Sequence, residues 1–113
     1  MSSHGFCLQR SSIISLLTKS WTNCMWSIDQ NKLFIFIDTK LIKEIKLNSN
    51  HELSEITNKD YNKYGNIYKF SLVYRDGIEK ITEVIFGSQN ENDINNLYIK
   101  LNNILNNNEN NSL

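Results

Sequence analysis

The side chains best suited to bind another molecule are basic and aliphatic, and they lie together near the start of the chain. Arg10 comes directly before the segment SSIISLLTKS (11–20), and Lys19 lies near its end, so the two flank its aliphatic side chains. Its aliphatic side chains are Ile13, Ile14, Leu16 and Leu17. Aliphatic groups gain about 25 cal/mol per Å² on leaving water, and a flanking cation adds on the order of 1 kcal/mol at an anionic leaflet. The pattern predicts a hydrophobic finger with a cationic collar that binds an anionic phospholipid membrane, with phosphatidic acid as one simple headgroup.

The same segment allows two other interpretations. Its aliphatic residues are also consistent with strands that continue into the core, or with a short helix that lies on the sheet. A third interpretation gives the apolar patch a protein partner. The sequence leaves these alternatives open.

Lysines recur in a second region, within or just before the segment Leu41–Leu47. We expect Lys40 and Lys43 to line the mouth of a binding site beside this segment, with Lys46 as a further candidate. The simpler alternative is a solvated strand face, which needs no ligand.

Catalytic, metal-binding and nucleic-acid-binding functions have little support. The two histidines, His4 and His51, are not spaced with the cysteines as zinc ligands would be. Only four glycines are present, and none form a phosphate-binding loop. The 12 basic and 12 acidic residues balance, so a broad attraction to nucleic acid is not expected. We therefore predict a protein that is not an enzyme and needs no cofactor or metal.

Two cysteines in a chain of 113 residues do not make a disulfide scaffold. We expect both to be thiols in a reducing compartment. If Arg10 pairs near Trp21, then Cys7 lies opposite Cys24, which would also permit a redox-sensitive pair. Two buried thiols are the simpler expectation.

The hydrophobic pattern predicts a sheet built from consecutive strands. Trp21 to Asp29 alternates, which places Thr22, Cys24, Trp26 and Ile28 on one inward face. Polar turns follow at 29–32 and 75–77. The predicted strands cover residues 6–10, 21–29, 33–38, 41–47, 53–56, 67–74 and 80–86.

The end of the chain predicts one helix. Ser88 and Glu91 fit a capping box. An apolar stripe then recurs at spacings of mostly three and four, formed by Ile94, Leu97, Tyr98, Leu101, Ile104 and Leu105. We expect the stripe to pack on the sheet and the asparagine-rich residues 107–113 to form a disordered tail.

The order of these segments resembles the pleckstrin homology (PH) domain over residues 4–106. GFCLQR (5–10), WTNCMWSI (21–28), Leu41–Leu47 and the hairpin around 68–86 carry the resemblance. It implies an all-β fold with one helix, a seven-stranded antiparallel bent barrel capped by a C-terminal α-helix. It also implies a binding adaptor that recognises lipids or proteins.

The chain departs from the family pattern at the positions that matter most for phosphoinositides. Lipid-binding members of the family that this chain resembles carry Lys or Arg at three positions. This chain has Gln9, Thr22 and Cys24 at those positions. Losing three charge-assisted bonds, at roughly 1.5–3 kcal/mol each, predicts at most weak phosphoinositide binding. Leu97 stands where the family usually has a helix tryptophan, and a leucine can still plug the barrel.

Together these patterns predict a cytoplasmic, membrane-peripheral module that recruits itself or a partner to anionic phospholipid through the first hairpin loop. The alternative is a PH-like protein-interaction scaffold with a vestigial lipid pocket. The expected location follows from residues 1–10, which lack the apolar core of a secretion signal. In size and asparagine content the chain is also similar to the acylated PH and inner-membrane-complex sub-compartment proteins of apicomplexan parasites, although no glycine follows Met1 as an acylation signal would require.

Overall fold

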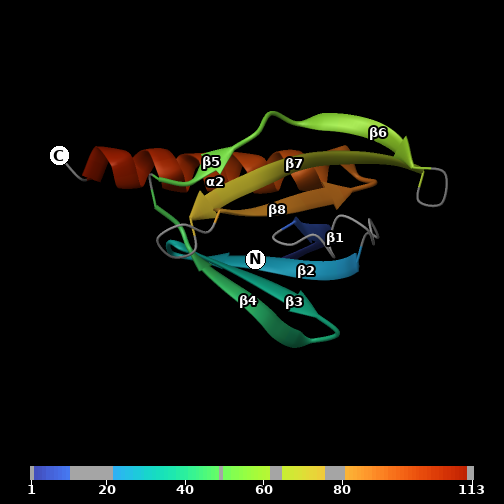
Figure 1. Ribbon diagram of the computed structural model, residues 1–113, viewed down its shortest axis with the longest axis horizontal. Coiled ribbons are helices and arrows are strands. Elements are labelled where there is room, and N and C mark those ends of the chain that lie inside the picture. The colour runs from blue at the N-terminus through green and yellow to red at the C-terminus, as the bar shows by residue number, and fades with distance from the viewer. Residues whose placement is uncertain (1, 11–21, 49, 62–64, 76–80, 112–113) are drawn as a thin grey trace.

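The computed structural model describes the backbone of residues 2–10, 22–48, 50–61, 65–75 and 81–111 (Figure 1). Within these ranges, side chains are described between residues 23 and 106. This part of the chain is mostly antiparallel β-sheet followed by a single helix. The coarse prediction of an all-β fold with one C-terminal helix is therefore confirmed.

Eight strands precede the helix in the described part of the chain. Their bounds are β1 (Ser2–Arg10), β2 (Thr22–Asp29), β3 (Lys32–Ile37), β4 (Lys40–Lys46), β5 (Glu52–Leu53), β6 (Thr57–Tyr61), β7 (Gly65–Arg75) and β8 (Ile81–Ser88). The helix α2 covers Glu91–Asn111.

The sheet has the order β4-β3-β2-β1-β8-β7-β5, with β6 also paired to β7. The described residues show no pairing that joins β4 to β5 or β6, so the barrel is not closed. The expectation of a seven-stranded barrel is corrected in this respect. Two short strands, β5 and β6, share the edge of β7, because its 11 residues are long enough to pair with both in turn.

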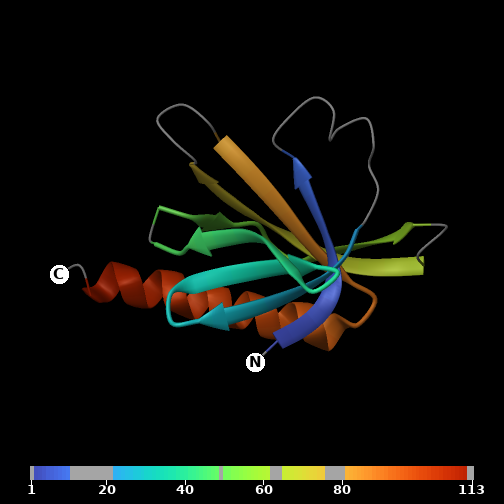
Figure 2. The same cartoon turned by 90° about the horizontal axis from the view of Figure 1, so that it is seen from below.

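β1 connects the two halves of the sheet. Its Ser2–Cys7 part pairs with β2, and its Phe6–Arg10 part pairs with β8. Figure 2 shows β1 curving from one half toward the other. This curvature folds the sheet over itself, so that the inner faces of the two halves enclose the core.

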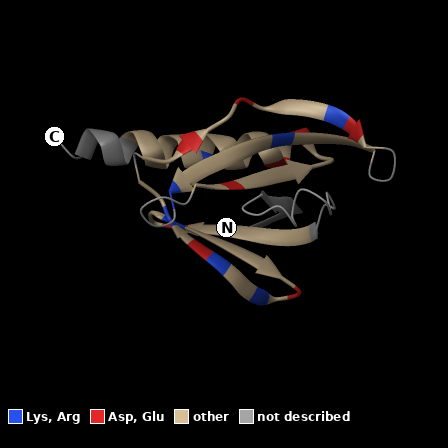
Figure 3. Cartoon of the chain, in the orientation of Figure 1, with Lys and Arg blue, Asp and Glu red and all other residues tan. Residues whose placement is uncertain are grey.

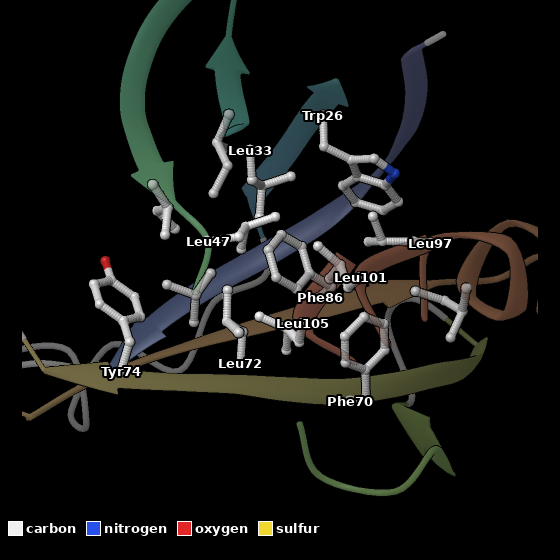
Figure 4. Close-up of a cluster of buried hydrophobic side chains, with 14 of the residues drawn as sticks. Trp26, Leu33, Leu47, Phe70, Leu72, Tyr74, Phe86, Leu97, Leu101 and Leu105 are labelled. Atoms are coloured by element: carbon white, nitrogen blue, oxygen red, sulfur yellow. The ribbon is translucent and has the colours of Figure 1, made fainter. Parts of the chain in front are cut away.

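The core forms where apolar residues of both halves meet the helix (Figure 4). Trp26 on β2 packs edge-on against Phe86 on β8, with ring centroids 5.6 Å apart, and Phe86 also contacts Phe70 on β7. Burying rings of this size is a dominant stabilising contribution in a small domain. The predicted inward face of residues 22–28 is confirmed at Cys24 and Trp26, which are buried, and at Ile28, which packs on the core.

The apolar stripe of α2 packs on the sheet as predicted. Its most buried members are Ile94, Leu97, Leu101 and Leu105. Figure 1 shows the helix lying along β7, and it also contacts β8 and β1. Leu97 is 3% exposed, so a leucine fills this part of the core.

The helix start differs from the predicted capping box. Asn90 is the cap, because its Oδ1 accepts a hydrogen bond of 2.9 Å from the N–H of Asn92. Ser88 instead ends β8, and its Oγ accepts the N–H of Asn90 at 3.0 Å. The backbone helix continues to Asn111, beyond the expected end at residue 106, in a stretch without Gly or Pro to stop it. The proposed limits of the domain stay a prediction.

Two details of the strand prediction need correction. Of the strand expected at 53–56, only Leu53 lies in a strand, β5, whereas Ser54 and Ile56 lie in the connection between β5 and β6. The register also differs, since Cys24 lies opposite Gly5 and Cys7 lies opposite Thr22. The two cysteines are therefore not directly paired, and Cys24 is buried as a thiol.

Candidate functional site

The predicted membrane finger falls outside the described residues. This applies to Ile13, Ile14, Leu16, Leu17 and Lys19. The ends of the finger are described: β1 ends at Arg10, whose backbone pairs with Glu83, and β2 begins at Thr22. Thr22 is the first described residue after the finger, so the surface around the start of β2 is one of the two described surfaces that follow the finger along the chain.

That surface carries a cross-strand row of apolar side chains. Met25, Phe36 and Leu41 are successive pairing partners on β2, β3 and β4, so they share the outer face of the sheet. Met25 and Phe36 are half-buried, whereas Leu41 is 52% exposed. Ile42 beside it is 53% exposed. These four residues are called the outer apolar row below.

A β-bulge explains why two consecutive aliphatic residues are exposed. The pairing shifts between Ile35 and Phe36, which face Lys43 and Leu41 respectively. Ile42 is thereby the extra residue, and the bulge ends the regular alternation of β4. The bulge agrees with the sequence of residues 41–47, in which apolar and polar side chains do not alternate regularly.

The β3–β4 turn borders the row. Asp38 and Thr39 both have positive φ, at 52° and 64°, which is typical of the tight turns that match the twist of a hairpin. A shallow cavity of about 220 Å³ lies beside the turn and is lined by Asn23, Cys24, Met25, Phe36, Asp38 and Thr39. Lys40 follows the turn and is exposed. The structure thus brings the predicted Lys40 next to apolar side chains and near the base of the finger.

Lys43 lies on the same side of the sheet as Lys40, because their partners Ile35 and Ile37 are two residues apart on β3. It pairs with the buried Ile35, so it shares the inner face of the sheet. Its Nζ lies 5.6 Å from the centroid of the Tyr74 ring, a cation–π distance. The expectation that Lys40 and Lys43 line the mouth of a binding site stays a prediction.

Tyr74 connects Lys43 to a polar pocket at the end of β7. His51 packs edge-on against Tyr74, with centroids 5.1 Å apart, and is 9% exposed. A cavity of about 370 Å³ is lined by Asn48, Asn50, His51 and Arg75. We call this cavity the His51 pocket.

Local hydrogen bonds organise the His51 pocket. The Asn48 N–H donates to Nδ1 of His51 at 2.9 Å, and the Asn50 N–H donates to Oδ1 of Asn48 at 2.8 Å. Because Nδ1 accepts, the neutral ring carries its proton on Nε2. Burial lowers the pKa of His51, because the charged imidazolium is poorly solvated there.

Sequence reasoning missed the His51 pocket. The sequence showed His51 only as a histidine without the spacing of a zinc ligand, and Arg75 only as part of a polar turn at 75–77. The pairing of β5 with β7, in which Glu52 lies opposite Val73, brings the two segments together.

Charges are interspersed rather than separated into faces. Figure 3 shows basic and acidic residues next to each other on β4 and on β6. An attraction to an anion must therefore be local. Among the described residues, no three His, Cys, Asp or Glu side chains are grouped as metal ligands, and no described helix is long and apolar enough to cross a membrane.

Comparisons with known proteins give no relative. No family model, no curated protein and no solved structure matches the chain.

Proposed function

We propose that this protein is a PH-like binding module that attaches peripherally to anionic phospholipid membranes. The contact surface is the first hairpin loop, with Arg10 and Lys19 at its ends, continued by the outer apolar row and Lys40. The module is not an enzyme, and it carries itself or a partner to the membrane.

The arrangement of the elements supports the PH-like part of the proposal. An antiparallel sheet in the order β4-β3-β2-β1-β8-β7-β5 is followed by one C-terminal helix that packs on its inner side. This arrangement resembles a PH domain, which is a bent antiparallel sheet with one helix across its open end. The open edge between β4 and β5 is compatible with it.

One observation carries the membrane part of the proposal. Leu41 and Ile42 are both more than half exposed, directly beside the exposed Lys40. Keeping two aliphatic side chains in water has a cost, which insertion into a lipid interface removes at about 25 cal/mol per Å². The adjacent ammonium group favours an anionic leaflet over a neutral one by on the order of 1 kcal/mol.

Co-sedimentation with liposomes tests this proposal. Vesicles of phosphatidylcholine alone are compared with vesicles that also contain phosphatidylserine, phosphatidic acid or phosphoinositides. The test variants are Leu41→Ser/Ile42→Ser in the apolar row and Leu16→Asp/Leu17→Asp in the finger. Ile99→Ser is the matched control, because Ile99 is 55% exposed on α2 and lies outside the proposed surface.

The proposal predicts binding to anionic vesicles that weakens at least about tenfold in each double variant and stays unchanged in Ile99→Ser. Increasing salt should weaken it further, because the headgroup contact is exposed.

A protein-interaction scaffold is the second candidate, and one observation favours it. β4 is an edge strand of the sheet, and an edge strand with exposed aliphatic residues is a template for an added strand. Folded wild-type protein that ignores every vesicle would favour this candidate over the membrane.

A further inference from the structure

We propose that the His51 pocket binds a phosphate group of an anionic ligand. The pocket lies at the opposite end of β4 from Lys40. Eight residues separate Lys40 from Asn48, which corresponds to roughly 26 Å of extended chain. The proposal therefore does not depend on the membrane surface described above.

The lining of the pocket consists of hydrogen-bond donors. Arg75 contributes a guanidinium with five N–H donors, so it can bind an anion while it also contacts another group. Asn48 and Asn50 contribute carboxamides, and His51 contributes an imidazole. Among the residues that the structure describes, no carboxylate lines this cavity, whereas the neighbouring cavity of about 210 Å³ includes Glu52.

The donors are oriented before any ligand arrives. The carboxamide oxygen of Asn48 is occupied by the Asn50 N–H, which leaves its NH₂ group as the outer, donating end. Nδ1 of His51 is occupied by the Asn48 N–H, which leaves Nε2–H as the donor of the neutral ring. Contact with Tyr74 holds the imidazole in place. Preorganised donors bind anions without a further ordering cost.

The surrounding charges favour an anion. Lys43 on β4 approaches the same Tyr74 ring, and Arg75 on β7 lines the pocket itself, so two cations lie near His51. Glu52 on β5 lies in the adjacent cavity and opposes them. A phosphomonoester dianion matches two cations and several neutral donors better than a monoanion does. Such a group is found on phosphatidic acid, on soluble sugar or inositol phosphates, and on inorganic phosphate.

Nuclear magnetic resonance titration of the full chain tests the pocket. Inorganic phosphate and glycerol 3-phosphate are added at constant pH and ionic strength, with chloride as the reference anion. Backbone and side-chain amide signals of Asn48, Asn50 and His51 are followed. Arg75→Gln removes the cation of the pocket, and Lys59→Gln removes an exposed lysine of β6 as the charge-matched control.

Saturable shifts of these amide signals with both phosphate probes, weakened about tenfold in Arg75→Gln but not in Lys59→Gln, are the expected result. A second arm identifies the source of the phosphate. Arg75→Gln is compared with wild type on vesicles that contain phosphatidic acid, and a weaker vesicle interaction would point to the lipid, whereas an unchanged one would point to a soluble phosphate.

Two results would overturn the proposal. One is a set of shifts that are equally large with chloride. The other is an Arg75→Gln protein, folded by its amide spectrum, that binds phosphate as well as wild type does. Neither result bears on the outer apolar row, so the two proposals fail independently.

Discussion

His51 is a buried, titratable residue of the described fold. Its pKa is lowered in the folded chain from an ordinary value of 6.5. Between the lowered pKa and 6.5, the folded chain binds fewer protons than the unfolded chain. The free energy of unfolding therefore falls as the pH drops below about 6.5, and the loss is complete below the folded pKa.

His51→Asn tests this account, because the Asn side chain can still accept the Asn48 N–H and does not titrate. We expect the unfolding free energy of wild type to fall more than that of His51→Asn as the pH falls from 7.5 to 5. Urea unfolding at a series of pH values measures it. Parallel curves for the two proteins over this range would contradict the assignment.

Thr82 provides a second prediction at the scale of one residue. It is fully buried, and its Oγ1 has no hydrogen-bond partner among the described residues. A buried hydroxyl without a partner costs about 1–3 kcal/mol, and valine has nearly the same shape. Thr82→Val should therefore raise the free energy of unfolding by about 1 kcal/mol. A loss of stability in chemical denaturation would show that the hydroxyl has a partner.

At the scale of elements, the β3–β4 turn is strained. Thr39 is β-branched and has a φ of 64°, a conformation that costs such residues on the order of 1–3 kcal/mol. Thr39→Gly removes the strain but adds freedom to the unfolded chain. We expect a net gain in unfolding free energy of about 1 kcal/mol, measured by urea unfolding. Ser54→Gly in the β5–β6 bend, where no positive φ is found, should show no gain.

The elements also show which parts of the fold were predictable. Alternation located β2 and β7, and the stripe from Ile94 to Leu105 located the helix, because periodicity reports directly on a buried face. The bulge at Ile42 and the split between β5 and β6 were not predictable. Both depend on which neighbouring strand is available for pairing, and that is decided by the folded sheet rather than by the local sequence.

At the scale of the whole molecule, some features of the proposed binding surfaces could be predicted from the sequence and others could not. Lys40 and Lys43 could be selected from sequence as charged residues near a strand, but the side of the sheet on which they lie follows from the bulge between them, which places them opposite Ile37 and Ile35 on one face of β3. The His51 pocket joins residues 48–51 to Arg75, and a sequence without related sequences to compare carries no sign of such a contact. The charge balance belongs to this scale as well, because it predicts that any anion binding is restricted to local clusters.

The central claim is that the outer apolar row contacts an anionic membrane. Its most direct test is the fraction of protein that sediments with phosphatidic-acid vesicles, measured for wild type, Leu41→Ser/Ile42→Ser and Ile99→Ser at the same lipid concentration. We predict that wild type and Ile99→Ser sediment alike and that the double variant stays largely in solution. Equal sedimentation of all three folded proteins, or none by wild type, would contradict the claim.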